Sequence, residues 1–166
     1  MKKGIGMVVS GLIGTALGAG IMKKMDKPEI DKSKNLKDLA DKHLALFLMM
    51  NQWVNIKQEG KNLSSYFERK GYKRIAIYGM SYAGCTLYDE LLSSDVEIAY
   101  LMDQNVSKAL GLGKGFGAKF VSMNDSLEEV DVIVVTPITF FEEIAEDLRH
   151  KINCPIVSLE DVINEV

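Results

Sequence analysis

Residues 74–84 read RIAIYGMSYAG, and this stretch decides the fold. Its first five letters form a short, mainly apolar run that is typical of a buried strand. The next six form a turn that begins and ends with glycine, and residues 85–92 have the character of a helix. An apolar run at 97–102 predicts a second strand, which ends at Asp103. Strand, glycine turn, helix and strand in this order predict a parallel α/β unit.

The glycine turn predicts a site for a nucleotide. Gly79 permits a tight turn, and Gly84 lets the helix pack closely on the strand. The start of the helix offers free N–H groups and a positive dipole to a phosphate, and Asp103 could accept hydrogen bonds from ribose hydroxyls. Ser81 stands where dinucleotide-binding turns usually have glycine. It limits how closely the backbone approaches a pyrophosphate, although its hydroxyl could donate to one.

The rest of the domain predicts further strands of the same sheet. Residues 131–136 form a run rich in β-branched side chains, as expected of a central parallel strand, and they end at Thr136-Pro137 beside the same crevice. The other expected elements are an edge strand at 119–122, a helix at 140–151, a strand at 155–158 and a helix at 159–166. The predicted fold class is α/β, a small doubly wound parallel sheet of Rossmann type over residues 72–166.

The predicted ligand is NAD, NADP or a nucleotide sugar. NAD is preferred over NADP because the carboxylate of Asp103 would meet the 2′-phosphate with like charge. The residues expected to bind the ligand are Gly79, Met80, Ser81, Tyr82, Ala83, Gly84, Asp103, Thr136 and Pro137. Cys85 and Cys154 belong to no C-x-x-C pair or Cys/His cluster, so a metal site is not expected. A net charge of -3 disfavours nucleic acid as a partner.

Residues 1–25 predict a membrane anchor. Gly4 to Ile21 contains no charged residue and is flanked by lysines, and as a helix it would be about 27 Å long. Small residues recur every four positions in a glycine zipper that would let a second helix approach, at Gly6, Ser10, Gly14 and Gly18. The alternatives are a cleaved signal peptide and a flexible tail. The predicted localisation is the cell membrane, single-pass, with membrane lipid as a partner and the main domain in the cytoplasm.

A linker and a helical lead-in are predicted between the anchor and the domain. Residues 26–34 are charged and include Pro28, which indicates a solvated linker, and residues 35–71 form the lead-in. Its first helix, at 35–59, has an apolar stripe at Leu36, Leu39, His43, Phe47, Met50 and Val54. Met49, Met50 and Trp53 broaden this stripe, which is expected to pack on the edge of the sheet or on the same helix of a second subunit, giving a homo-oligomer. A short helix from Asn62, its predicted cap, to Lys70 follows and ends at Gly71.

Part of the chain resembles a known group of proteins. Lys73 to Gly84, followed by the strand ending at Asp103, is similar to the nucleotide-binding domains of bacterial surface-polysaccharide enzymes. These include the amino-terminal domains of sugar acyltransferases and of nucleotide-sugar dehydratases and epimerases. Residues 46–60, with MMNQW and KQEG, resemble a helical lead-in found in capsule-gene proteins of gut Firmicutes. The resemblance covers most of residues 43–166 and implies a role in envelope polysaccharide synthesis.

Three functions are compatible with these patterns. The leading hypothesis is a membrane-tethered cytoplasmic module that binds NAD(P) or a nucleotide sugar and assists envelope polysaccharide biosynthesis. The second is a minimal NAD-dependent oxidoreductase or nucleotide-sugar epimerase. The third is a structural protein of a membrane complex whose Rossmann domain binds no ligand.

Overall fold

The computed structural model describes residues 27–107 and 115–166, and the chain forms two compact units, residues 1–39 and 40–166. Of the first unit, it describes the helical residues from Lys27 to Leu39. The predicted anchor with its zipper positions Gly6, Ser10, Gly14 and Gly18 lies outside the described residues, so the zipper stays a prediction.

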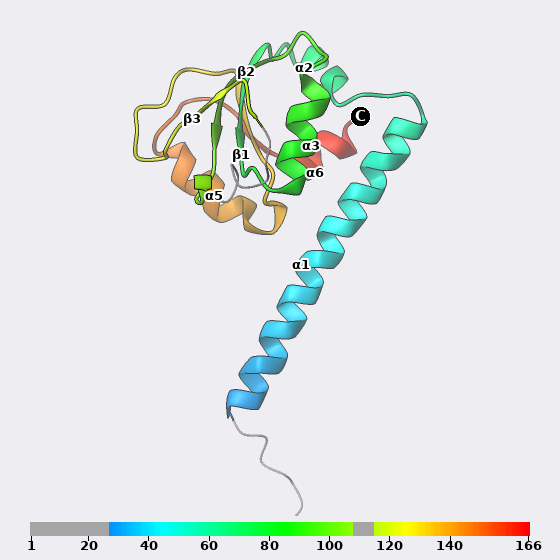
Figure 1. Ribbon diagram of the computed structural model, residues 1–166, viewed down its shortest axis with the longest axis vertical. Helices are drawn as coiled ribbons and strands as arrows, with labels where there is room; N and C mark the ends of the chain where they lie inside the picture. The colour runs from blue at the N-terminus through cyan, green and yellow to red at the C-terminus, as the bar shows by residue number, and fades with distance from the viewer. Residues whose placement is uncertain (1–26, 108–114) are drawn as a thin grey trace, which may run out of the picture. The chain divides into compact units, whose positions relative to one another are not determined.

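A parallel sheet forms the centre of the second unit (Figure 1). Its strands are β1 (Arg74–Tyr78), β2 (Glu97–Met102), β3 (Lys119–Phe120), β4 (Val132–Val135) and β5 (Ile156–Ser158). Their order is β3-β2-β1-β4-β5, and every neighbouring pair is parallel. The predicted α/β class with a parallel sheet is confirmed. The order matches the first five strands of a dinucleotide-binding sheet, which makes the fold consistent with a Rossmann-like arrangement.

Helices cover both faces of this sheet because its central strands are apolar on both sides. Ile75 and Ile77 of β1 pack into one core, whereas Ala76 and Tyr78 pack into the other. The first core is closed by residues from the C-terminal half of α1 (Lys27–Gln58), α2 (Ser64–Lys70), α3 (Tyr82–Leu91) and α6 (Leu159–Asn164). The second is closed by α5 (Phe141–Arg149), which follows a short 3-10 helix, η1 (Ile138–Phe140).

Helix α1 begins earlier than the sequence predicts. Residues 27–34 were expected within a linker, but they form the first turns of the helix. Pro28 is compatible with this position, since the N–H groups of a first helical turn have no partner within the helix.

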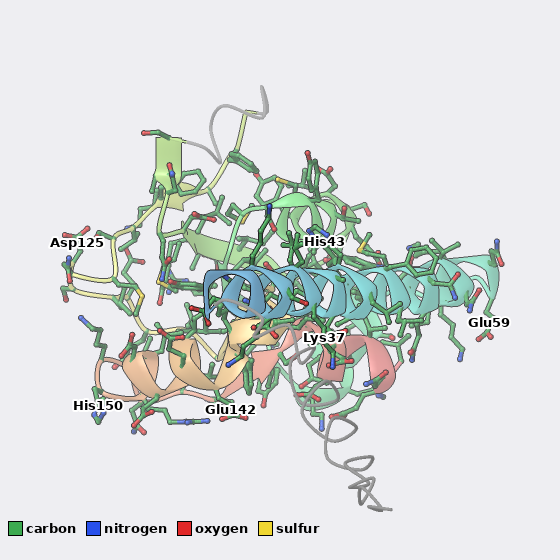
Figure 2. The ribbon with its side chains drawn as sticks, turned by 90° about the horizontal axis from the view of Figure 1, so that it is seen from below. Lys37, His43, Glu59, Asp125, Glu142 and His150 are labelled. Atoms are coloured by element: carbon green, nitrogen blue, oxygen red, sulfur yellow. The ribbon has the colours of Figure 1, made fainter. Side chains whose placement is uncertain are left out.

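The buried face of α1 includes Met49 and Trp53 of the predicted stripe but not most of its other members. The side chains that enter the core are Met49, Trp53 and Ile56, each at most 7% exposed. In contrast, Phe47 is 65% exposed and Val54 is 50% exposed. Leu36, Leu39 and His43 are also exposed. Met50 is partly buried and packs against the core. His43, labelled in Figure 2, is exposed. The error arises because α1 is apolar on two sides, and spacing alone does not select the side that faces the sheet.

The start of α2 shows a smaller difference. Leu63 precedes the helix without a side-chain cap, and the side-chain oxygen of Asn62 accepts a hydrogen bond from Lys57 instead. The end of α2 is as predicted, because Gly71 adopts a left-handed conformation with φ of 74°.

The predicted membrane localisation is corrected. Among residues 27–107 and 115–166, no helix is both long and apolar enough to cross a membrane. The longest described helix, α1, carries charged residues in each turn from Lys32 to Lys42, and its uncharged stretch from His43 to Ile56 is shorter than the ~20 residues that a bilayer requires.

Candidate functional site

A cavity of about 380 Å³ lies at the carboxyl ends of the strands. We call this end of the sheet the ending edge. It is lined by Tyr78, Gly79, Ser81, Asp103, Gln104, Pro137, Phe140, Glu143 and Ile144. The chain runs outward from β1 to β2 and β3 on one side, and β4 lies on the other side of β1. The cavity thus lies where strand order reverses, which is where open α/β sheets bind ligands.

Gly79 makes the turn at the end of β1 possible. Its φ is +94°, a conformation that residues with a side chain rarely adopt. A Cβ at this position would also lie 2.5 Å from Cδ of Pro137. The N–H of Gly79 donates to the carbonyl of Met102 at 2.8 Å, so the turn stays joined to the end of β2.

Gly84 lets α3 pack against this turn. A Cβ on Gly84 would lie 2.0 Å from the carbonyl oxygen of Gly79, which is shorter than any real contact. That carbonyl accepts a 2.5 Å hydrogen bond from Oγ1 of Thr136, whose residue is only 2% exposed. Thr136 therefore holds the turn from within the core rather than lining the cavity.

Asp103 joins the end of β2 to the glycine turn. Its Oδ2 accepts from the N–H of Met80 at 2.6 Å, and its Oδ1 accepts from the N–H of Asn105 at 2.7 Å. A carboxylate has about four lone-pair positions, so two such bonds leave it able to accept from a ligand hydroxyl. Asp103 thus both fixes the turn and presents acceptor capacity to the cavity.

The predicted ligand-binding residues separate into three groups. Gly79, Ser81, Asp103 and Pro137 line the cavity. Four others are buried and shape the turn beneath it, namely Met80, Ala83, Gly84 and Thr136. Tyr82 is 77% exposed and lies outside the lining.

Sequence reasoning did not identify the part of the cavity contributed by η1 and α5. Phe140, Glu143 and Ile144 line it, together with Tyr78 and Gln104. A signal for these residues existed, since a helix that follows the strand at a switch point starts beside the crevice.

The charge of the cavity is negative. Asp103 and Glu143 line it, and among the described residues that do so there is no lysine or arginine. The pKa of the Tyr78 phenol is raised, mainly by burial. A hydrogen bond with Gln104 lowers this pKa, whereas the negative charges of Asp103, Asp147 and Glu143 raise it. The cavity wall also offers apolar surface from Phe140, which is 46% exposed.

A larger cavity of about 780 Å³ lies near the other end of α3. Glu90 lines this cavity, accepts hydrogen bonds from Nε1 of Trp53 and from the N–H of Leu63, both at 2.7 Å, and pairs with Lys57 at 3.2 Å. These groups satisfy one another and join α1, the start of α2 and α3. The arrangement is structural.

Among the described residues, no group of three or more His, Cys, Asp or Glu side chains could hold a metal ion. Comparison with known proteins finds no match, whether to a protein-family model, to a curated protein or to a solved structure. The resemblance to polysaccharide-biosynthesis proteins therefore stays a prediction. The class that the structure defines is an α/β protein with a five-stranded parallel sheet.

Proposed function

We propose that this protein binds a nucleotide-containing small molecule, NAD(P) or a nucleotide sugar, at the ending edge of its sheet, as an accessory to envelope polysaccharide biosynthesis. The observation that carries the proposal is the position of the cavity at the point where strand order reverses, beside a glycine turn and an acid at the end of the second strand. The polysaccharide setting rests on the sequence resemblance alone.

The chemistry of the lining residues fits the parts of such a ligand. Asp103 accepts two hydrogen bonds from backbone N–H groups. Its remaining lone pairs can accept hydrogen bonds from ribose hydroxyls. Phe140, Pro137 and Ile144 offer apolar surface to a base or a nicotinamide ring. The first turn of α3, which begins after Ser81, would offer its N–H groups and positive dipole to a phosphate bound beside Ser81.

Isothermal titration calorimetry of the full chain with NAD, NADP and UDP-glucose tests this proposal. Binding of one of these is expected, with NADP weaker than NAD because its 2′-phosphate would meet Asp103. Ser81→Asp should lower the affinity about tenfold or more, since it adds an anion at the start of α3. The matched control is Thr86→Asp, an exposed position one turn further along α3 that does not line this cavity.

The outcomes separate the alternatives. A failure of all three ligands to bind would contradict the proposal and favour a structural role. Equal affinity in wild type and Ser81→Asp would place the phosphate elsewhere. Turnover of a bound ligand, monitored by nicotinamide absorbance or by chromatography of the sugar nucleotide, would identify an oxidoreductase or an epimerase.

A further inference from the structure

The candidate cavity lacks a counter-charge for the phosphates of its proposed ligand. Asp103 and Glu143 both contribute negative charge, and the described lining includes no basic side chain. A pyrophosphate carries negative charge of its own, so a site with this lining alone would repel it. The start of α3 offsets only part of this repulsion, because a helix terminus acts as roughly half a unit charge. A cation from outside the lining would offset the rest of this repulsion.

Helix α1 brings one cation to this edge. Trp53 of α1 bonds to Glu90 near the end of α3, which fixes the two helices at the edge where the strands begin. Eleven residues before Trp53 along α1 stands Lys42, a distance of about 16 Å in a helix. Helix α3 has 10 residues and is about 15 Å long, so a helix that runs alongside it would bring Lys42 level with its start.

The position of Lys42 agrees with this estimate. Its Nζ lies 4.2 Å from the centre of the Phe140 ring, and Phe140 lines the cavity. Among the described residues Lys42 forms no salt bridge. Contact between an ammonium group and an aromatic ring is weak at an exposed site. A charge-assisted hydrogen bond to phosphate is stronger, and the flexible lysine stem can turn toward it.

We propose that Lys42 of α1 is the phosphate-binding cation of the cavity, resting on Phe140 without ligand and pairing with a phosphate of the bound nucleotide. This inference rests on the proposed function, because it assigns a role in binding that same ligand. It also gives α1 a functional part: the helix is anchored to the domain by Met49, Trp53 and Ile56, and it presents Lys42 at the site.

The test compares Lys42→Gln, Lys42→Arg and the control Lys61→Gln in the full chain. Lys61 lies just beyond α1 and pairs with Glu59 at 3.0 Å on the exposed surface. Calorimetry with NAD and UDP-glucose at low salt should give an affinity about tenfold lower for Lys42→Gln, near wild type for Lys42→Arg and unchanged for Lys61→Gln. Added NaCl should weaken binding more steeply in wild type than in Lys42→Gln, because one ion pair is missing from the variant.

Each outcome decides one of the two proposals. Tight binding by wild type and equally tight binding by Lys42→Gln, with the same salt dependence, would remove Lys42 from the site and leave the proposed function standing. No binding of either ligand by wild type would overturn the proposed function, and this inference with it. A loss in Lys42→Gln that Lys42→Arg fails to restore would also contradict a simple charge role. Melting curves of each variant check that the fold is retained.

Discussion

The two ends of the parallel sheet differ in how their charged residues are paired. At the starting edge, where the strands begin, Arg74 pairs with Glu97 at 3.1 Å and with Glu128 at 2.6 Å, and Glu128 also pairs with Lys119. These contacts link the beginnings of β1, β2 and β3. At the ending edge, Asp103 and Glu143 line a cavity without a basic neighbour in the described lining.

The difference separates acids that are paired with basic side chains from acids that line a cavity without such a partner in the described lining. Lys119 and Arg74 hold the pKa of Glu128 below its ordinary value, as expected for a carboxylate paired with cations. At the ending edge the acids instead raise the pKa of a neighbouring phenol, Tyr78, after the larger effect of burial. Unbalanced charge beside a cavity is a feature of binding sites more than of scaffolds.

The largest effect is expected at Gly84, below the ending edge. Gly84→Ala would bring Cβ to 2.0 Å from the carbonyl oxygen of Gly79, and backbone on both sides must move. We expect a loss of about 3 kcal/mol in the free energy of unfolding, measured by urea denaturation. The control is Gly115→Ala, since nothing lies within 4 Å of a Cβ there. Equal stability of the two variants would show that α3 can shift away from the turn at little cost.

The next largest effect is expected at Glu90, near the starting edge. Its side chain is only 10% exposed, and Glu90→Ala leaves the N–H groups of Trp53 and Leu63 without their acceptor. The expected loss is about 2–3 kcal/mol, because buried donors would lose their partner. Glu59→Ala removes an exposed pair with Lys61 and should change stability by less than about 0.5 kcal/mol. A similar small change for Glu90→Ala would contradict its role in joining α1 to α3.

A smaller effect is expected at Asp131, which also belongs to the starting edge. Hydrogen bonds from the N–H groups of Arg74 and Lys73 lower its pKa below the ordinary value. Ionised Asp131 therefore stabilises the fold at neutral pH, and this stabilisation is lost as the pH falls through the lowered pKa. Asp131→Asn should cost about 1 kcal/mol at pH 7, limited by solvent screening.

The acid dependence distinguishes this effect from a simple loss of packing. The stability difference between wild type and Asp131→Asn should shrink on acidification below the ordinary aspartate range. Asp125→Asn is the control, an exposed loop residue that accepts one N–H bond at 3.1 Å (Figure 2). A difference for Asp131→Asn that stays constant down to low pH would rule out the charge as its cause.

Much of the sheet could be predicted from local sequence. The runs at 74–78, 97–102 and 132–135 are apolar and short, and each lies next to a turn signal or an acid that ends it. The glycine turn was also predictable, because Gly79 and Gly84 mark positions where backbone conformation and close packing exclude a side chain. These requirements are local, so the residue types in a short stretch of sequence are enough to predict them.

The orientation of α1 and the rest of the site could not be predicted in this way. Phe47 and Met49 are both apolar, and which one is buried depends on how the helix packs against the rest of the domain. Likewise, Phe140 and Glu143 join the cavity through the packing of α5 after β4, and Lys42 reaches Phe140 from a helix almost 100 residues earlier. Such contacts depend on tertiary structure, which periodicity does not encode.

The smallest effect on stability, and the sharpest test of the division between edges, is expected at Glu143. Glu142 and Glu143 both lie in the first turn of α5, where each interacts favourably with the helix dipole, but only Glu143 lines the ending-edge cavity. Glu143→Gln and Glu142→Gln should therefore each lower stability by no more than about 0.5 kcal/mol in thermal melts. Their effects on ligand affinity should differ. Removing the charge of Glu143 reduces repulsion of a phosphate and should tighten NAD or UDP-glucose binding about threefold at low salt, whereas Glu142→Gln should leave it unchanged. Weaker binding by Glu143→Gln would mean that this carboxylate accepts a hydrogen bond from the ligand. Equal tightening by both variants would mean that the overall negative charge of α5, rather than the charge lining the cavity, weakens ligand binding.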